Sequence, residues 1–493
     1  MNNMNWLAIV PEIALLTMAC VVALVDLWIT DPRRTLTYWL TQFSLGIVAV
    51  LHLVAFDRGE TVYAMQHMVV ADPMGHLLGF FATLSVMITL VYARPYAESR
   101  EMLKGELFTL SMFSLLGIGV MVSANNFLVV YLGLELMSLS LYALTALRRD
   151  HPPATEAAMK YFVLGALASG FLLYGLSMMY GATGSLDLGE VFKAIGTGQI
   201  NKAVLVFGVV FVVSGLAFKI GAVPFHMWIP DVYQGAPTAV TLLIAGAPKL
   251  AAFAITMRLL VDGMLGLAVD WQQMLVVLAV GSLVIGNLAA IAQSNLKRML
   301  GYSTIAQMGF MLLGLCSGVV NGNTLSAANA YSSAMFYVVT YVLTTLGIFG
   351  VIMLLSREGF EAEQIDDFKG LAQRSPWYAA VMAIFMFSLA GIPPTVGFYA
   401  KLSVLQALVS TNVPAFIVLA VVAVMLSLVG AFYYLRVVKV MFFDAPSDMQ
   451  PIIATGDVRG VLSANGAAIL LFGLLPGGLM AMCAQAIVKA LGT

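Results

Sequence analysis

The sequence predicts an all-α integral membrane protein with about fourteen transmembrane helices. Of its 493 residues, 61% are hydrophobic and only 10% are charged, whereas soluble domains carry about 25% charged residues. Mean hydropathy is +0.95, which is more apolar surface than a single water-soluble core could bury. A helix needs about 20 apolar residues to cross a bilayer, and stretches of this kind follow one another along the chain.

Fourteen apolar segments separated by short polar linkers account for nearly the whole sequence. They cover approximately residues 6–29, 36–56, 73–93, 106–123, 126–147, 156–180, 203–229, 237–261, 272–292, 299–317, 327–355, 377–410, 413–435 and 463–488. No soluble domain or low-complexity tract interrupts the pattern, so one polytopic domain over residues 1–493 is expected. Residues 1–5 contain no basic residue, which is unlike a cleaved signal peptide.

The distribution of basic residues predicts the orientation. Linkers after odd-numbered segments contain fifteen Lys and Arg residues, and linkers on the other side contain five. Cytoplasmic loops carry the excess of positive charge. Both termini are therefore expected on the side away from the cytoplasm.

Composition and motifs exclude several classes of activity. The net charge is −1 and there is no basic tract, which argues against nucleic-acid binding. Three cysteines far apart in apolar segments, Cys20, Cys316 and Cys483, imply neither a disulfide framework nor a thiolate metal site. HExxH, CxxC, Walker and GxSxG motifs do not occur, so nothing indicates redox, nucleotide or hydrolytic chemistry in this chain.

Four lysines and one glutamate stand out among the ionisable residues of the apolar segments, because a charge at mid-membrane costs about 2.5–3.5 kcal/mol or more and usually serves an ion path. They are Glu135, Lys160, Lys219, Lys249 and Lys401. On a helix, Ser138 and Tyr142 lie on the same face as Glu135. We interpret Glu135 and Lys219 as a switchable ion pair whose opening releases the lysine proton towards Lys249. Transfer between neighbouring helices would need bridging waters, because helix axes are about 8–10 Å apart.

Two of the segments are long and interrupted. The seventh and twelfth contain Gly221, Pro224, Pro230, Gly391, Pro393 and Pro394. Proline removes a backbone donor and clashes with the preceding turn, so both segments are expected to unwind inside the membrane. Unwound backbone at that depth is tolerated only where it is buried in protein or lines a wet cavity, and paired interruptions point to a transporter's ion site.

The interruptions also predict an internal repeat. Each broken segment is the fourth in a group of five, over residues 105–262 and 272–437. A unit with an odd number of spans must invert its topology when it is repeated head to tail. Two inverted five-helix repeats are therefore expected.

Several side chains admit both a functional and a structural reading. Among the histidines, only His226 lies at a helix break, where it could relay protons or satisfy backbone groups. The other histidines, His52, His67, His76 and His151, are expected to be solvated. Lys160 could be an uptake relay or a snorkelling side chain, and the Glu135–Lys219 pair could simply fix helix packing. Glu12 and Asp231 are expected to have structural roles.

The stretch KIGAVPFHMWIPDVYQGAPTAV…APK, from Lys219 to Lys249, resembles the signature of the antiporter-like membrane subunits of respiratory complex I and their multi-subunit cation/proton antiporter relatives. Further similarity lies in NNFLVVYLGLELMSLSLYAL around Glu135, MKYFVLGALASGFLLYG around Lys160, LKRMLGYSTIAQMGF at 296–310 and LAGIPPTVGFYAK at 389–401. The resemblance covers essentially the whole chain. It is strongest to members that lack a lateral-helix extension and carry lysine at the position of Lys401.

The resemblance implies a non-redox subunit of a proton-translocating NADH:quinone oxidoreductase in the bacterial inner membrane, with both termini periplasmic. The five intramembrane residues match the family's proton-channel positions, and His226 matches a further family position. NADH, FMN, iron–sulfur clusters and quinone would belong to partner subunits, with no cofactor in this chain. Expected partners are a neighbouring antiporter-like subunit, small membrane subunits, the lateral helix of a partner, and lipids.

Two other functions remain open at this point. One is a subunit of a multi-subunit cation/proton antiporter, which would favour carboxylates and carbonyls as ligands for a hard cation, whereas this sequence supplies lysines that repel sodium. The other is a structural membrane subunit with no proton path. Unchanged proton pumping after Lys219 is neutralised would support that second alternative.

Overall fold

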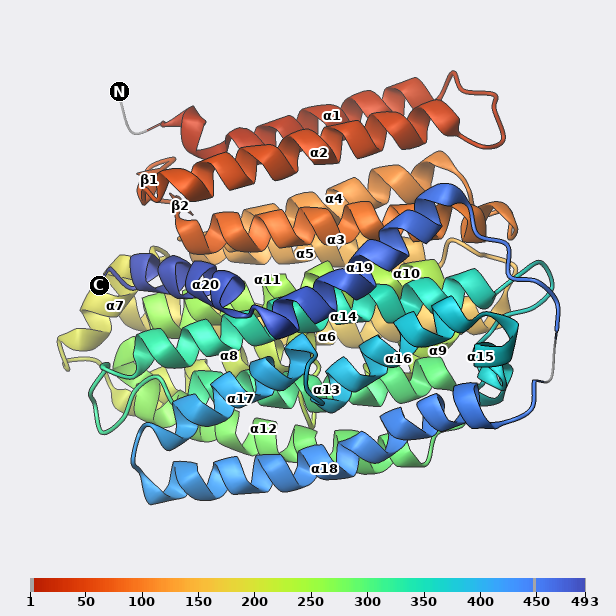
Figure 1. Cartoon of the computed structure of the whole chain (residues 1–493). Coiled ribbons are helices and arrows are strands. Elements are labelled where there is room, and N and C mark those ends of the chain that lie inside the picture. The colour runs from red at the N-terminus through yellow and green to blue at the C-terminus, as the bar shows by residue number, and fades with distance from the viewer. Residues whose placement is uncertain (1–3, 447–448, 493) are drawn as a thin grey trace.

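The computed structural model describes residues 4–446 and 449–492. Long helices pack side by side along one common direction (Figure 1). Within the described residues, thirteen helices are long and apolar enough to cross a membrane. The twelfth predicted segment is occupied by two shorter helices that follow one another. The fourteen predicted segments therefore all coincide with helices.

The helices of the first half are η1 Trp6–Ile9, α1 Val10–Asp26, α2 Thr35–Arg58, α3 Pro73–Glu98, α4 Gly105–Val122, α5 Phe127–Thr145, α6 Pro152–Thr183, α7 Leu188–Gly196, α8 Lys202–Ile220, α9 Trp228–Gly235, α10 Thr238–Ala245, α11 Ala247–Thr256 and the π-helical η2 Met257–Gly263. Those of the second half are η3 Leu265–Leu267, α12 Ala268–Ile291, α13 Leu296–Cys316, α14 Ala327–Leu355, η4 Ile365–Phe368, α15 Leu371–Arg374, α16 Pro376–Ala390, α17 Val396–Val409, α18 Pro414–Phe443, α19 Gly456–Leu474 and α20 Gly477–Ala490.

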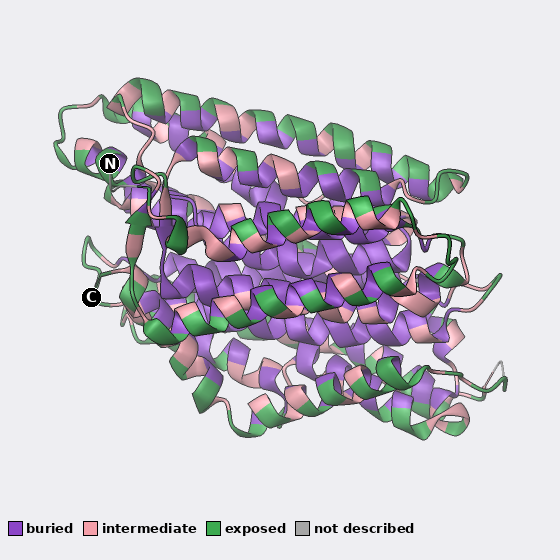
Figure 2. Cartoon of the chain, turned by 90° about the horizontal axis from the view of Figure 1, so that it is seen from above, coloured by how far each residue is buried: buried purple, intermediate pink, exposed green. Residues whose placement is uncertain are grey.

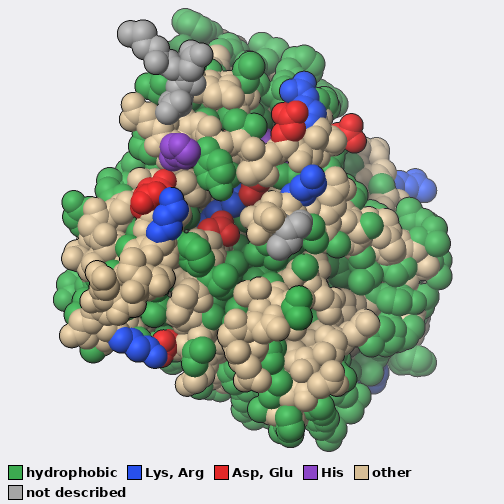
Figure 3. Space-filling model, turned by 90° about the vertical axis from the view of Figure 1, so that its left-hand side faces the viewer, with side chains coloured by type: hydrophobic (Ala, Val, Ile, Leu, Met, Phe, Trp, Pro, Cys, Tyr) green, Lys and Arg blue, Asp and Glu red, His purple; other side chains and the backbone are tan. Residues whose placement is uncertain are grey.

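Apolar side chains cover both the inside and the outside of the bundle. The central helices α13 and α14 are 94% buried over their most apolar stretches, while α1 and α18 at the edge are only 22% buried (Figure 2). The exposed residues of the outer helices are large and apolar, for example Leu24, Val50, Val418 and Leu428. Seen end-on, hydrophobic side chains cover much of the rim, and the charged side chains lie scattered singly or in small groups (Figure 3). This distribution fits a bundle whose sides face lipid.

One short sheet departs from the all-α prediction. Strands β1 Val62–Ala64 and β2 Val69–Ala71 pair antiparallel between α2 and α3. Strands of three residues are too short to produce a readable alternation of apolar and polar residues. The sheet and both labelled termini lie at the same end of the bundle (Figure 1), which we call the hairpin end; we call the opposite end the α15 end.

Two predicted spans are not continuous helices. Segment 463–488 is divided into α19 and α20, which meet at Leu475 and Pro476, because proline has no amide hydrogen to continue the ladder. Segment 237–261 is divided into α10 and α11 at Gly246, whose φ and ψ of −93° and −108° are not helical. Segment 463–488 is therefore not one continuous helix, whereas Thr238–Gly263 remains one candidate span that bends at Gly246.

The helices around Lys219 and Lys401 end at glycines. Helix α8 ends at Ile220 and is followed by Gly221 with φ 88°, and α16 ends at Ala390 and is followed by Gly391 with φ 84°. Glycine adopts this left-handed conformation without a steric penalty. The chain resumes as α9 and α17, so the last carbonyls of α8 and α16 lie inside the bundle and need donors from elsewhere.

Close packing of α4 on α5 gives a first prediction. A Cβ added at Gly117 would overlap the backbone nitrogen of Met137 and the carbonyl oxygen of Gly133. Gly117→Val is expected to lower the free energy of unfolding by at least about 1–3 kcal/mol, measured by thermal unfolding of the solubilised protein. At Gly170 of α6 nothing lies within 4 Å of such a Cβ, so Gly170→Ala is the control. Equal stability of both variants would contradict the close packing.

Candidate functional site

Lys219 lies in the last turn of α8, with 8% of its surface exposed. Its Nζ donates to Ser138 Oγ on α5 over 2.7 Å. Glu135 lies one helical turn before Ser138, and its Oε1 is buried without a hydrogen-bond partner among the described residues. Among the described residues, Lys219 thus contacts the Ser138 hydroxyl, and no ion pair joins it to Glu135; the switchable Glu135–Lys219 pair stays a prediction.

Lys249 caps the C-terminal end of α8. From α11 its Nζ donates to the carbonyl oxygens of Ile220 at 3.0 Å and Lys219 at 3.5 Å, and the residue is 1% exposed. The indole of Trp228 donates to the Phe218 carbonyl over 3.0 Å. The three last carbonyls of α8 thus receive side-chain donors, and the negative end of the helix dipole holds the ammonium.

Lys401 has the same role at the end of α16. Its Nζ donates to the carbonyls of Leu389 and Ala390, both over 3.0 Å, and to Ser427 Oγ over 2.8 Å. It is 9% exposed. Two lysines that are remote in sequence therefore each close the open end of a helix that stops inside the bundle.

A chain of neutral polar side chains continues from Lys401. Gln307 on α13 donates to the Leu389 carbonyl over 3.0 Å and to the Tyr434 hydroxyl over 2.9 Å, and it accepts from the Tyr337 hydroxyl. These residues were not predicted as site residues. The available signal was a glutamine inside an otherwise apolar span, in the motif LKRMLGYSTIAQMGF.

Small cavities lie beside the buried lysines. One of about 10 Å³ is lined by both Lys219 and Lys249, and another of about 10 Å³ is lined by Lys401 and Gln307. A volume of this size holds about one water molecule. Polar atoms and space for single waters therefore occur together at both helix ends.

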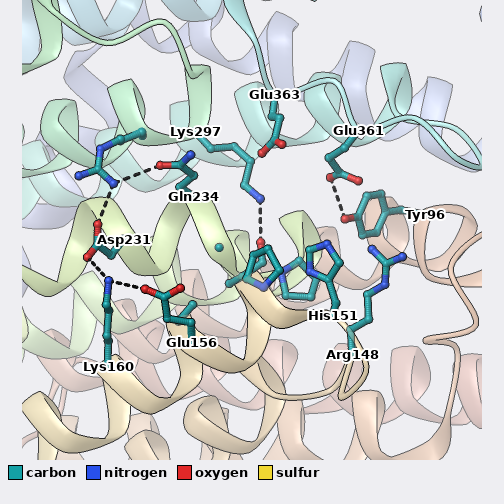
Figure 4. Close-up of a pocket in the computed structure, with 16 residues that line it drawn as sticks. Tyr96, Arg148, His151, Glu156, Lys160, Asp231, Gln234, Lys297, Glu361 and Glu363 are labelled. Carbon is teal, nitrogen blue, oxygen red and sulfur yellow. Dashed lines mark hydrogen bonds and ion pairs between the residues drawn. The ribbon is translucent and has the colours of Figure 1, made fainter.

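Lys160 lies apart from the other lysines, in a cavity of about 420 Å³ at the α15 end (Figure 4). Its Nζ pairs with Glu156 at 2.8 Å and with Asp231 at 2.7 Å, and its side chain is 42% exposed. Asp231 also pairs with Arg298 at 2.7 Å. Asp231, expected only to be structural, therefore links two basic residues across the cavity.

The opposite wall of this cavity is built around Glu361. Its carboxylate contacts Arg100 at 2.7 Å, the Tyr96 hydroxyl at 2.8 Å and the Thr238 hydroxyl at 2.6 Å. Burial by itself would raise the pKa of Glu361, but the cations of Lys297 and Arg100 and these hydrogen bonds hold that pKa below its usual range.

His226 lies half-buried in the connection between α8 and α9, next to the exposed Met227. Its Nδ1 is buried and has no hydrogen-bond partner among the described residues. The hydrogen bonds around Lys219 and Lys249 do not include it. Within the described ranges, no group of three or more His, Cys, Asp or Glu residues could hold a metal ion.

Comparison with known proteins places the chain among subunits of one type. Residues 124–427 match the family described as NADH:quinone oxidoreductase/Mrp antiporter, TM. NADH-quinone oxidoreductase subunit N of Polaromonas naphthalenivorans is 64% identical over 99% of this chain and 98% of its own length. The subunit N of Herminiimonas arsenicoxydans is 64% identical over the full length of both chains.

Solved structures share the fold. A chain of respiratory complex I from Thermus thermophilus with bound aureothin has a TM-score of 0.81 and 30% identity, covering 97% of this chain and 100% of its own. A chain of the Mrp complex from Dietzia has a TM-score of 0.83 at 20% identity, covering 98% of this chain and 97% of its own. At 20% identity, the similarity to the Mrp chain shows a shared fold only.

The capping role of Lys249 gives a second prediction. Lys249→Met removes the donor to Ile220 and Lys219, leaving buried carbonyls unpaired. The free energy of unfolding is expected to fall by about 1–3 kcal/mol, measured by thermal unfolding of the solubilised protein. Lys202→Met, which changes a lysine that is 71% exposed in its side chain, is the control. If the two variants are equally stable, the capping contacts do not stabilise the helix end.

Glu361 gives a third prediction. Because its pKa is lowered in the folded protein, its ion pairs stabilise the fold fully above the unfolded pKa of about 4.3, and this contribution is lost as the pH falls through the lower, folded value. Glu361→Gln is expected to cost about 3 kcal/mol at pH 7 and to remove this part of the acid dependence. Thermal unfolding from neutral to acid pH tests it, with the exposed Glu358→Gln in the same loop as the control. Superimposable curves for the two variants would refute it.

Proposed function

The chain belongs to the subunit N family of NADH-quinone oxidoreductase, and we propose that within that complex it moves protons across the membrane through buried lysine side chains. The chain is thus one membrane subunit of an enzyme complex. In the proposal its own role is not redox, and NADH, FMN, iron–sulfur clusters and quinone act in partner subunits. Quinone reduction there drives the proton movement here.

The observation that carries the proposal is the kind of atom that holds each buried ammonium. The contacts of Lys219, Lys249 and Lys401 are made to hydroxyl and carbonyl oxygens, and none of the described ion pairs joins a carboxylate to them. A direct carboxylate contact would strongly favour the charged lysine, whereas neutral oxygens accept hydrogen bonds from both the ammonium and the amine. Such lysines can therefore change protonation state without losing their positions.

The proposed route begins at the cavity around Lys160. That cavity is at the α15 end, where most basic linkers gather, so we place this end on the cytoplasmic side. Protons taken up by Lys160, Glu156 and Asp231 would pass inward to Glu135, Ser138 and Lys219. Support for this direction comes from the exposure of Lys160 and from the unpaired carboxylate oxygen of Glu135.

The next steps lead from Lys219 to Lys249 and then to Lys401. A cavity lined by the first two lysines has room for about one water. Gln307 of α13 donates to the same Leu389 carbonyl as Lys401. Its side-chain amide and the hydroxyls of the neighbouring tyrosines would continue the route from Lys401. His226, at the break after α8, is a further candidate relay because its Nδ1 lacks a partner among the described residues.

We also propose that residues 105–262 and 272–437 are inverted repeats. Gly117 of α4 packs against the backbone of residues 133 and 137, and Gly286 of α12 packs against the backbone of residues 302 and 306. Each of the three positions in the second contact lies 169 residues after the corresponding position in the first. Asn126 and Asn295, which cap α5 and α13, have the same spacing. The first helices of the two repeats run in opposite directions, which supports the inversion. The last residue of α4 lies near the hairpin, where Ala124 pairs with Val69, whereas the last residue of α12 lies at the α15 end.

The same spacing indicates how the repeats differ. The positions 169 residues after Glu135, Ser138 and Lys219 hold Thr304, Gln307 and Ser388. In this proposal, only the first repeat has an acid, Glu135, and a base, Lys219, at these matched positions beside its helix break. The second repeat keeps a polar path without them and relies on Lys401. The two halves would therefore load and release protons differently.

The cation/proton antiporter alternative is less well supported. A sodium ion prefers several carboxylate and carbonyl oxygens converging on one site. At both helix breaks the carbonyls already accept from lysine ammonium groups, whose charge opposes a metal cation. The apolar outer helices suit contacts with lipid and with other membrane-arm subunits, including a neighbouring antiporter-like subunit and a partner's lateral helix.

Lys219→Ala tests the proposal. In the intact complex in sealed vesicles, NADH-driven proton uptake and electron transfer are expected to fall together by at least about tenfold, since the variant removes a positioned proton carrier. Lys193→Ala, in the exposed α7 with 72% of its side chain accessible, is the control. An assembled Lys219→Ala complex with unchanged proton uptake and electron transfer would leave Lys219 with a packing role only.

A further inference from the structure

Two histidines meet inside the bundle near the hairpin end. His52 of α2 and His76 of α3 are only 4% and 9% exposed. Their Nδ1 atoms are 3.3 Å apart. The expectation that both are solvated is therefore wrong, because the two helices pack with these side chains facing each other.

Each histidine of the pair lines a different cavity, and Pro11 of α1 lines both cavities. His76 lines a cavity of about 350 Å³ that is also lined by Arg58 and Glu60 at the end of α2. His52 lines an internal cavity of about 10 Å³ together with Glu12 of α1. The small cavity has room for about one water. The two imidazoles, in contact through their Nδ1 atoms, thus connect a side chain of the larger cavity with one that shares the small cavity with a carboxylate.

Glu12 is only partly satisfied at this position, where Ser123 and its own backbone amide are the neighbours of the carboxylate. Its Oε2 is buried and lacks a hydrogen-bond partner among the described residues. A buried polar atom normally has such a partner, so an orphaned carboxylate oxygen beside a cavity indicates a group that binds a water or a proton there.

Glycines on the neighbouring helices make room for these side chains. A Cβ added at Gly79 of α3 would lie 2.6 Å from His52 Cε1 and 2.8 Å from its Nε2. A Cβ at Gly119 of α4 would lie 3.4 Å from Glu12 Cγ. The His52 ring therefore rests directly on the α3 backbone, and its position depends on the absence of a side chain at Gly79.

The nearby charged groups at the start of α3 and in η2 are already paired. Asp72, at the start of α3, accepts from both terminal nitrogens of Arg258 at 2.8 Å, and Arg258 also contacts Asp262 at 3.2 Å. Facing the larger cavity are Arg58 and Glu60. Charged groups appear at this end in the space-filling view (Figure 3). Among the groups that line the small cavity, Glu12 is the titratable partner left for His52.

We propose that His76, His52 and Glu12 form a proton-exchange path between the larger cavity and the bundle interior, separate from the lysine chain. A proton from water binds Nε2 of His76, which passes its Nδ1 proton to Nδ1 of His52. His52 then releases its Nε2 proton through one water to the Glu12 carboxylate, forming the carboxylic acid. Each ring ends neutral, with its two nitrogens exchanged in role, and the reverse sequence returns the proton.

The geometry suits one proton at a time. A neutral pair needs one donor and one acceptor at the Nδ1 contact, and each ring then keeps its Nε2 on the far side for the next transfer. Two imidazolium rings at this distance would repel each other strongly inside the bundle.

Infrared spectroscopy of the intact complex in membranes tests the path directly. After a drop in pH from about 8 to 5, the carboxylic-acid C=O band of Glu12 is expected to form, and the band lost in Glu12→Gln assigns it. In His52→Gln and His76→Gln its formation is expected to slow by about a hundredfold, since each removes a positioned proton carrier. Gly79→Ala, which displaces the His52 ring, should slow it as well while leaving both histidines present.

His67→Gln is the matched control, because His67 is an exposed histidine in the turn of the hairpin beside the same cavity end. It is expected to leave the rate unchanged. Two results would overturn the proposal. Formation of the band at the same rate in all the histidine variants would mean that protons reach Glu12 by another route. Absence of a Glu12 band throughout the pH range would mean that Glu12 binds no proton. Neither result depends on the lysine chain.

Discussion

A helix that stops inside an apolar bundle leaves its last carbonyl oxygens without donors, and this constraint organises the centre of the protein. Water cannot satisfy these groups in a membrane interior. Lys249 donates to the end of α8 and Lys401 to the end of α16, and Trp228 completes the first set. The buried lysines and the interrupted helices therefore stabilise each other, since each supplies what the other lacks.

The same constraint separates two kinds of charged residue in the molecule. Towards the ends of the bundle, charges are held in direct ion pairs, such as Arg258 with Asp72 and Lys160 with Asp231. At the helix breaks, the ammonium groups meet hydroxyls and carbonyls. A group held by neutral oxygens can lose its proton without leaving a bare carboxylate behind, which is the property that a proton carrier requires.

The histidine pair extends this contrast to the hairpin end. Arg258 holds Asp72 through two hydrogen bonds, so that carboxylate is not available to the nearby His76. The imidazoles instead contact each other, and Glu12 keeps an unpaired oxygen. Uncommitted titratable groups thus occur in two places, at the helix breaks and beside the hairpin, each next to a small cavity.

The sequence by itself determined the positions of the apolar segments, the glycine- and proline-rich interruptions and the presence of lysines inside them, because these depend on residue type and local backbone preference. It could not decide which atoms meet. Ser138 and Lys219 are 81 residues apart, His52 and His76 are 24 apart, and Lys160 and Asp231 are 71 apart. Such contacts depend on how each helix is rotated about its axis against its neighbours. Only the tertiary structure therefore decided that Lys219 donates to Ser138, that the two histidines are buried and that Asp231 pairs with Lys160.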